Sequence, residues 1–296
     1  MTFRFGFFFV LVACAPQASS TSTTPDPSAE PTTGAETSIP DGFTEIEPGL
    51  LFREASVQRG ERVTTVWLYR PTRLEPGTHP LVAVAPGGSN LLTGMGLADG
   101  DRPEHLPYVR AGFLVVSYSL DGALSPNASD VEFEQAVRHF GAAAAGTEDA
   151  RAAVELATEV LPVDPNRIFA AGHSSAATHA LLLACTQPQL FAAVAAYAPA
   201  VDVEHNYARQ GIDDPAVLHV ARAFSPSQHC SDFDRPTLLF AAEDDPVIDV
   251  ERMQSFHMTL PAEPRRVLIL VPNGGHYQPM IEQGIPAAID FFESLF

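Results

Sequence analysis

Short apolar segments alternate with longer helical segments along most of this chain, and this alternation limits the available folds more than any other feature. Strand-like segments lie at 63–71, 81–86, 112–119, 167–172, 191–199, 236–243 and 265–272. Helix-like segments lie at 147–161, 175–186, 250–260 and 280–296. Most of the strand-like segments are continuously apolar, as expected for a parallel sheet with both faces buried. The pattern predicts an α/β fold with a mostly parallel central sheet, helices on both faces and N-terminal strands that can pair antiparallel at its edge.

We expect a single domain over residues 42–296, in which two long segments break the alternation. Residues 121–146 contain the turn-forming stretches SPNAS and GAAAAG, and we expect a long loop there. Residues 201–235 mix polar and apolar residues and are a candidate for a small helical cap. Loops of this length in compact domains are usually functional or mobile.

The formal net charge of −19 argues against nucleic acid as a partner, because a phosphate backbone would be repelled. No cluster of lysine or arginine offsets this repulsion. The charge is in keeping with the surface of a soluble exported protein.

The first residues form a targeting segment rather than part of the fold. Arg4 precedes a short apolar run from Phe5 to Ala13, which is too short to span a bilayer as a helix. The stretch LVAC that ends at Cys14 resembles a bacterial lipobox, so residues 1–13 are expected to be a lipoprotein signal peptide and Cys14 the lipidated residue. Simple secretion is the alternative. Alanine rather than aspartate at position 15 favours the outer membrane.

Residues 14–41 are rich in serine, threonine and proline and have almost no large apolar side chains. Such a segment cannot bury enough surface to offset its ordering entropy, so we expect a flexible tether. Behind a lipid anchor it would let the domain stand away from the membrane.

Two cysteines remain once Cys14 is assigned to lipidation. Cys185 and Cys230 are either a disulfide, as an exported protein permits, or two buried free thiols, and the spacing does not decide between them. The histidines and cysteines have no zinc-binding spacing, so no metal is expected.

The stretch GHSSA, residues 172–176, follows a strand-like segment and opens a helix-like one. A sharp strand–turn–helix of this kind lifts a serine hydroxyl clear of the sheet, which makes Ser174 a candidate nucleophile. Alanine takes the last place of the G-x-S-x-G pattern. The alternative is that Ser174 only caps the helix.

A nucleophilic serine needs a base, and the base needs an orienting acid. His276 follows the strand-like segment 265–272 on a glycine-rich loop, and Asp244 and Asp245 directly follow segment 236–243. Ligands bind at the carboxyl ends of strands in open α/β sheets, and all these residues lie at such ends. This coincidence favours catalysis over capping for Ser174.

With these segments in place, the chain resembles the α/β-hydrolase superfamily. VDPNRIFAAGHSSAA is similar to the elbow of small esterases and of dienelactone-hydrolase-like and prolyl oligopeptidase-type catalytic domains, and EDDPVID and GGH are similar to their acid and base segments. The family's chain order is Ser, Asp, His, and its spacing implies Asp245 as the acid. Asp244 is the second choice, Glu243 is disfavoured, and Asp249 is expected to cap the next helix.

The resemblance also implies two backbone N–H groups for the developing oxyanion. One is expected from Ser175 and the other from Gly88 in the stretch VAPGGSN, with Gly87 and Ser89 as alternatives. A plain turn is the other interpretation of these glycines.

Other side chains near these motifs carry weaker expectations. His173 either lines the pocket or is structural, and Tyr118 is a candidate to face the pocket. His179, Trp67 and Tyr69 are expected to be packing residues.

The function this implies is a cofactor-independent serine hydrolase that cleaves small or polymeric carboxylic esters through an acyl-enzyme on Ser174, with His276 as base and Asp245 as the orienting acid. A prolyl oligopeptidase-type peptidase is the alternative, although the N-terminal region is too short for the propeller usual in those peptidases. A hypothesis of a different functional class is that the chain is a non-catalytic, surface-anchored binding protein on a hydrolase scaffold.

Overall fold

The structure, a computed structural model, describes residues 40–230, 233–262 and 265–296. The predicted signal peptide, Cys14 and the predicted tether up to residue 39 lie outside these residues. Among the residues that are described, none of the helices combines the length and the apolar character needed to cross a membrane.

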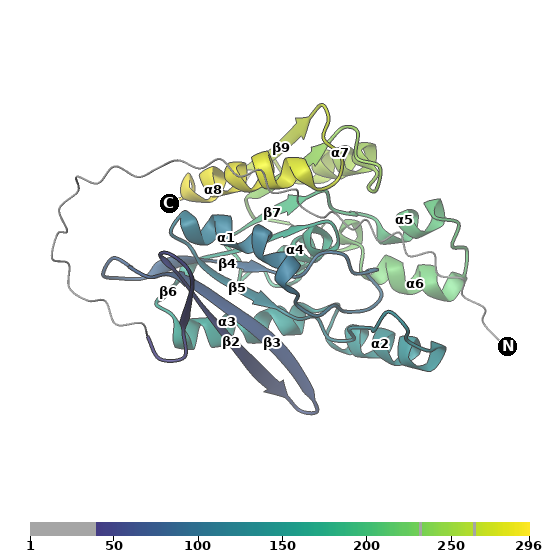
Figure 1. Ribbon diagram of the computed structural model, residues 1–296. Coiled ribbons are helices and arrows are strands. Elements are labelled where there is room, and N and C mark those ends of the chain that lie inside the picture. The colour runs from purple at the N-terminus through teal and green to yellow at the C-terminus, as the bar shows by residue number, and fades with distance from the viewer. Residues whose placement is uncertain (1–39, 231–232, 263–264) are drawn as a thin grey trace, which may run out of the picture. The chain divides into compact units, whose positions relative to one another are not determined.

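In the described part of the chain, nine strands form one sheet (Figure 1). They are β1 (Thr44–Glu47), β2 (Leu50–Arg59), β3 (Arg62–Pro71), β4 (His79–Val84), β5 (Leu114–Tyr118), β6 (Val163–His173), β7 (Ala193–Tyr197), β8 (Thr237–Ala242) and β9 (Arg266–Val271). Their order is β1-β2-β3-β5-β4-β6-β7-β8-β9. The pairs from β1 to β5 are antiparallel, and all pairs from β5 to β9 are parallel. The predicted mostly parallel sheet is therefore confirmed.

Helices cover both faces of this sheet. They are α1 (Arg102–Arg110), α2 (Asp130–Ala142), α3 (Thr147–Val160), α4 (Ser175–Thr186), α5 (Val203–Arg209), α6 (Pro215–Ala223), α7 (Val250–Thr259) and α8 (Ile285–Glu293), with short turns of helix η1 (Asp99–Asp101), η2 (Pro226–Gln228) and η3 (Met280–Gly284). One apolar layer contains residues of α3, α4 and α7, and the other contains residues of α1 and α8.

Strand β4 shows why its sequence is continuously apolar. Leu81 and Ala83 belong to one apolar layer, whereas Val82 and Val84 belong to the other. Successive side chains of a strand point to opposite faces, so a strand that is covered on both faces needs apolar residues at every position.

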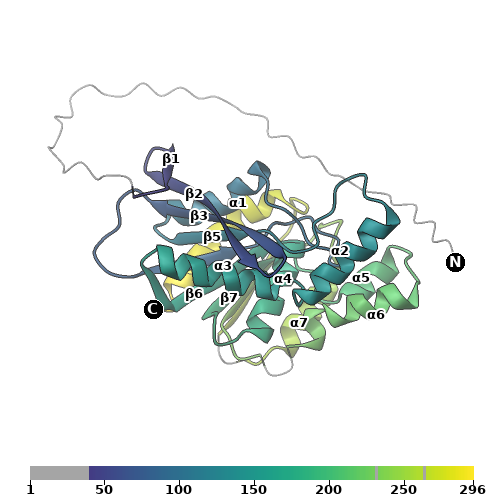
Figure 2. The ribbon, with the colours of Figure 1, turned by 90° about the horizontal axis from the view of Figure 1, so that it is seen from below.

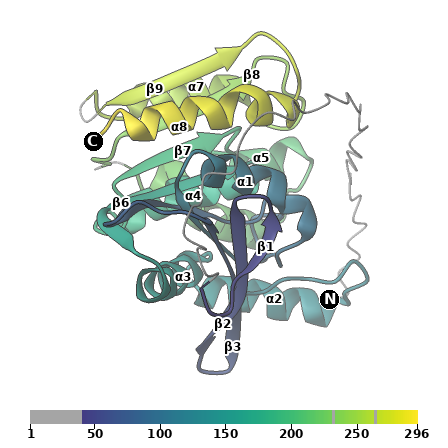
Figure 3. The ribbon, with the colours of Figure 1, turned by 60° about the vertical axis from the view of Figure 1, so that its left-hand side comes forward.

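The β2–β3 hairpin extends beyond the rest of the sheet (Figure 3). Arg59 at its tip forms ion pairs with Asp149 of α3 and with Asp121, and the Thr64 hydroxyl donates to Asp149 Oδ1 over 2.9 Å. The Asp149 side chain is fully buried. These contacts connect the antiparallel edge to the helical layer.

The segment expected to be a long loop, residues 121–146, contains helix α2. Ser129 is its N-cap, and the Ser129 N–H donates to Glu132 Oε2 over 2.7 Å. This reciprocal capping box satisfies amide groups at the start of a helix whose outer face is polar. The loop expectation was wrong because Ser129 and Glu132 were not recognised as a helix start.

Residues 201–235 contain α5, α6 and η2, which lie beside α2 at one end of the molecule (Figure 1, Figure 2). Val203, Tyr207 and Ala221 form a small apolar cluster with Leu92 of the loop that follows β4. The Tyr207 hydroxyl also donates to the carbonyl of Asn90 in that loop. The two short helices therefore pack against a loop at the carboxyl edge of the sheet.

A disulfide joins Cys185 of α4 to Cys230, with a Cα–Cα distance of 5.2 Å. This decides the alternative that the sequence left open. The bridge makes a covalent loop of the segment that contains β7, α5 and α6, and it anchors the end of this segment to α4.

Candidate active site

Ser174 lies in the turn between β6 and α4, where the sequence predicts a nucleophile elbow. Its backbone has φ 59° and ψ −120°, a region that residues other than glycine rarely occupy and that costs about 1–3 kcal/mol. The Ser174 N–H donates to the carbonyl of Tyr197 at the end of β7, over 2.8 Å. A Cβ atom at Gly172 would lie 2.5 Å from the carbonyl carbon of Ala176. The small residues of GHSSA therefore allow the helix to approach the strand.

His276 and Asp245 meet at the carboxyl edge of the sheet. The His276 Nδ1–H donates to Asp245 Oδ2 over 2.7 Å. The other oxygen of Asp245 accepts from the N–H groups of Val247 and Ile248, over 2.8 and 3.2 Å. The Asp245 side chain is 1% exposed, so its position is well defined by these bonds.

The environment of Asp245 keeps its carboxylate charged. Burial alone raises the pKa of this carboxyl, but the hydrogen bond and charge interaction with His276, together with the two backbone N–H groups, outweigh burial. The pKa of Asp245 therefore lies below its usual value. A charged acceptor at Nδ1 leaves the lone pair of a neutral His276 ring on Nε2, as a general base requires.

The neighbouring acids have different roles. Asp244, the second choice for the acid, accepts from the N–H groups of Gly274 and Gly275 over 3.2 and 2.9 Å, and so holds the loop that carries His276. Asp249 caps α7 by accepting from the Arg252 N–H over 3.0 Å, as predicted. Sequence reasoning did not find the loop-holding role of Asp244.

The glycine-rich loop after β4 lies beside the elbow. The Ser89 N–H donates to Ser175 Oγ over 2.9 Å, and a Cβ atom at Gly87 would lie 3.1 Å from the His173 carbonyl oxygen. Among the described residues, neither the Gly88 N–H nor the Ser175 N–H has an acceptor. These are the two donors that the sequence predicts for an oxyanion. The side-chain contact of Ser175 was not foreseen.

The base-bearing loop contacts the elbow through His173. The His173 Nε2–H donates to the carbonyl oxygen of His276 over 2.7 Å, and the two rings lie with their centroids 4.6 Å apart. Because His173 directly precedes Ser174, this contact brings His276 next to the candidate nucleophile. Within the described residues, no hydrogen bond joins Ser174 Oγ to His276. Such bonds are often long without substrate and tighten in the reactive complex.

The remaining candidates are packing residues. Tyr118 is fully buried, with its hydroxyl 3.2 Å from His179 Nε2, so the expectation that it faces the pocket is wrong. Burial lowers the pKa of His179 to about 4. Trp67 and Tyr69 pack around Phe52 in the N-terminal strands. In the part of the chain that the structure describes, no group of three or more His, Cys, Asp or Glu residues is arranged to hold a metal ion.

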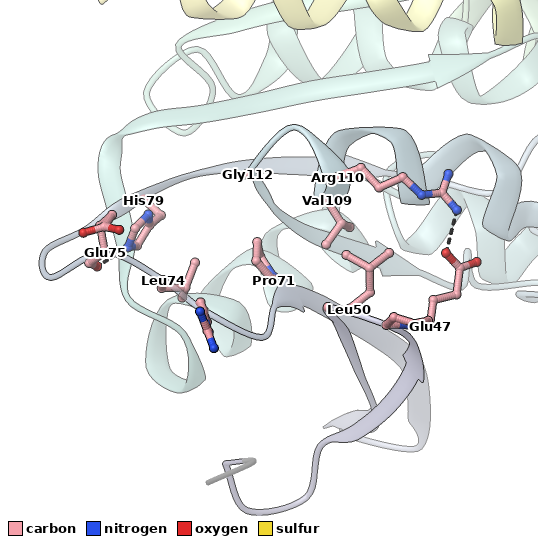
Figure 4. Close-up of a pocket in the computed structure, with 12 residues that line it drawn as sticks. Glu47, Leu50, Pro71, Leu74, Glu75, His79, Val109, Arg110 and Gly112 are labelled. Carbon is pink, nitrogen blue, oxygen red and sulfur yellow. Dashed lines mark hydrogen bonds and ion pairs between the residues drawn. The ribbon is translucent and has the colours of Figure 1, made fainter. Parts of the chain in front are cut away.

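A cavity of about 500 Å³ lies at the amino-terminal ends of the parallel strands, opposite to the ends that carry the candidate triad (Figure 4). It is lined by His79 at the start of β4, by Gly112 ahead of β5 and by the ion pair of Glu47 with Arg110. The candidate triad lies at the carboxyl ends of β6, β8 and β9 instead. The cavity is thus separate from the candidate active site.

Comparison with known proteins identifies the family of most of the domain. Residues 105–290 match the profile of the prolyl oligopeptidase family, a range that includes all three members of the candidate triad. A sequence comparison with curated proteins finds no match.

Solved structures of similar fold include peptidases and an esterase. A prolyl endopeptidase is 18% identical with a TM-score of 0.64, covering 84% of this chain and 38% of that one. An acylaminoacyl peptidase of Pyrococcus horikoshii is 16% identical with a TM-score of 0.65, covering 83% of this chain and 41% of that one. An acetyl xylan esterase of Paenibacillus sp. R4 is 14% identical with a TM-score of 0.61, covering 85% of this chain and 87% of that one. The chain thus spans about two fifths of the length of these peptidases. At such low sequence identities, the structural similarity shows that the fold is shared.

Proposed function

Because this chain belongs to the prolyl oligopeptidase family of serine hydrolases, we propose that it cleaves carboxylic esters through an acyl-enzyme formed on Ser174. The observation that carries the proposal is the 2.7 Å bond between His276 and the buried Asp245, held next to a serine with φ 59°.

In the first half-reaction, Ser174 Oγ attacks the ester carbonyl carbon, and His276 Nε2 takes the hydroxyl proton. Asp245 accepts from Nδ1 throughout and stabilises the imidazolium that forms. The oxyanion of the tetrahedral intermediate would accept from the N–H groups of Gly88 and Ser175, for which the described part of the chain offers no other acceptor. His276 then returns the proton to the alkoxide as the C–O bond breaks.

In the second half-reaction, water replaces the alcohol. His276 takes a proton from the water as its oxygen attacks the acyl carbon, and it then returns that proton to Ser174 Oγ as the acid product leaves. The protein supplies the base, the nucleophile and the oxyanion donors from its own side chains and backbone.

The proposed preference for esters is supported by the structural match to the acetyl xylan esterase, which covers 87% of that protein. For the peptidases, the likeness is confined to 38–41% of the other chain. Peptide hydrolysis is the second candidate, because the matched family is described as a peptidase family.

The decisive experiment is intact-mass spectrometry of the protein after treatment with a fluorophosphonate, with Ser174→Ala as the matched control. One adduct on the wild type and none on the variant is the expected result. A well-folded wild type that takes no adduct would support the non-catalytic binding protein instead.

If the wild type forms this adduct, fresh untreated protein is then compared on acyl esters and on peptide anilides of matched acyl groups. Faster turnover of the esters, lost in Ser174→Ala, supports the ester proposal. Turnover of the peptide anilides alone would replace it with the peptidase.

A further inference from the structure

His173 occupies the variable position before the candidate nucleophile, yet its surroundings are closely defined. Its Nε2 atom lies 2.7 Å from the carbonyl oxygen of His276. A carbonyl oxygen only accepts hydrogen bonds, so the hydrogen must be on Nε2 of His173. The bond is made to the backbone of His276, whose side chain is already held by Asp245.

The ring of His173 is enclosed by the loop that it binds. Its centroid lies 4.6 Å from the ring of His276 and 5.5 Å from the ring of Tyr277, and only 5% of the residue is exposed. The two rings of the loop therefore contact the same buried histidine.

The other nitrogen of His173 faces an acid. Nδ1 lies 3.9 Å from Oε1 of Glu104, a contact too long to be a hydrogen bond, and the Glu104 side chain is 12% exposed. Burial, reinforced by the charge of Asp101, raises the pKa of Glu104 to about 8, and burial lowers the pKa of His173 to about 4. At neutral pH a protonated carboxyl thus faces an unprotonated Nδ1, which favours the Nε2–H form of the ring.

We propose that His173 is a positioning residue, which holds His276 in register with Ser174 by donating from Nε2 to the His276 carbonyl, while Glu104 faces its other nitrogen. This inference rests on the proposed function, because it assigns His276 the role of the base. His173 itself does not touch the reacting atoms.

The chain positions explain why this bond matters for the reaction. His173 is the last residue of β6 and Ser174 follows it directly, so the bond connects the nucleophile's strand to the base's loop without an intervening residue. Without the donor, the loop would keep Asp244 and Asp245 as anchors but lose its attachment to the elbow. Misplacement of a catalytic group by about 1 Å costs about 100-fold in rate, so we expect kcat to fall about 10- to 100-fold with KM little changed.

Two substitutions separate the hydrogen bond from ring packing. His173→Phe keeps an aromatic ring and removes the donor, whereas His173→Gln places an amide N–H near the former Nε2 and removes the ring. The matched control is His79→Phe, since His79 Nε2 also contacts a carbonyl, that of Glu75 at 2.9 Å, but lies at the opposite edge of the sheet. Ester kcat and KM and the rate of fluorophosphonate labelling are measured for each.

We expect His173→Phe to lose rate, His173→Gln to recover most of it, and His79→Phe to match the wild type. Wild-type rates in His173→Phe would overturn the proposal, because they would show that the hydrogen bond is not needed. This holds even if His173→Gln is slow, since that loss would then come from the missing ring.

A measurement on the unmodified protein decides the case if both His173 variants are slow or fail to fold. In protein labelled with ¹⁵N-histidine, long-range ¹H–¹⁵N spectra at pH 7 report the form of each ring. We expect a ring with hydrogen on Nε2 alone for His173. A charged ring or a ring with hydrogen on Nδ1 at His173 would overturn the proposal. Failure of the proposed function would show separately, as an absent adduct on the wild type or an adduct retained by Ser174→Ala.

Discussion

The hydroxyl oxygen of Ser175 accepts a hydrogen bond from the backbone N–H of Ser89 at 2.9 Å. Ser175 is the first residue of α4 and Ser89 lies in the loop after β4, so the bond joins the two segments that carry the proposed oxyanion donors. It also removes the Ser89 N–H from the donors that a substrate oxygen could use, which leaves Gly88 and Ser175.

Ser175→Ala tests this arrangement, because it removes the acceptor for Ser89 and keeps the Ser175 N–H. A neutral hydrogen bond contributes about 0.5–1.5 kcal/mol, which corresponds to about a 2- to 10-fold loss in ester kcat if the loop is displaced in the transition state. Ser255→Ala is the control, since that hydroxyl donates to the carbonyl of Glu251 within α7. An unchanged kcat in Ser175→Ala would show that the loop keeps its place without the bond.

The two adjacent aspartates are distinguished by paired substitutions. Asp245→Asn should lower kcat about 10³- to 10⁴-fold, because an amide at this place favours the wrong form of the His276 ring. Asp244→Asn keeps one oxygen for the N–H groups of Gly274 and Gly275 and should cost less than about 10-fold. Steady-state kinetics of both variants on one ester measures these changes in kcat. Equal losses of kcat in the two variants would contradict the assignment of Asp245 as the orienting acid.

Reduction of the disulfide should destabilise the domain. The cysteines are 45 residues apart, and closing a loop of that size stabilises a protein by about 2–4 kcal/mol, mainly by restricting the unfolded chain. Urea unfolding of Cys230→Ser and of the wild type with and without reductant measures this. We expect the reduced wild type to match the variant, and a wild type indifferent to reductant would contradict a structural role for the bridge.

The contribution of Glu104 to stability should fall as the pH rises from about 4.5 to about 8. Burial raises the pKa of this acid to about 8 in the folded protein, so over this range Glu104 binds more protons in the folded state than in the unfolded state. The buried His173 and His179, whose pKa values are lowered to about 4, act in the opposite direction up to about pH 6.5. The groups that interact with Glu104 are Asp101, His173, Tyr108 and Tyr197. The unfolding free energy of the wild type minus that of Glu104→Gln, whose amide imitates the neutral acid, should therefore decrease from pH 5 to pH 9. Parallel pH profiles of the two proteins would contradict this.

The resemblance of the stretch ending at Cys14 to a lipobox predicts a membrane-bound protein. In cells that process lipoproteins, the full-length chain should fractionate with membranes and incorporate labelled palmitate, whereas Cys14→Ser should do neither. If Cys14→Ser stays with the membrane fraction to the same extent, the anchor is not at Cys14.

The sequence by itself determined the fold class and the region of the site. Its apolar strands and the helices between them require a parallel sheet, and the carboxyl ends of parallel strands meet at one edge. Ser174, Asp245 and His276 each follow a strand, so pattern alone was enough to place them at that edge.

Only the tertiary structure decided which groups touch there. It paired Asp245 rather than Asp244 with His276, joined Cys185 to Cys230, and turned one nitrogen of His173 to the His276 carbonyl and the other to Glu104. These contacts depend on how loops from distant parts of the chain fold against one another. Local periodicity carries no information on these loop contacts, because a loop's conformation is set by hydrogen bonds to residues far away in the chain. Asp245 and His276 are 31 positions apart, and His173 and His276 are 103 apart.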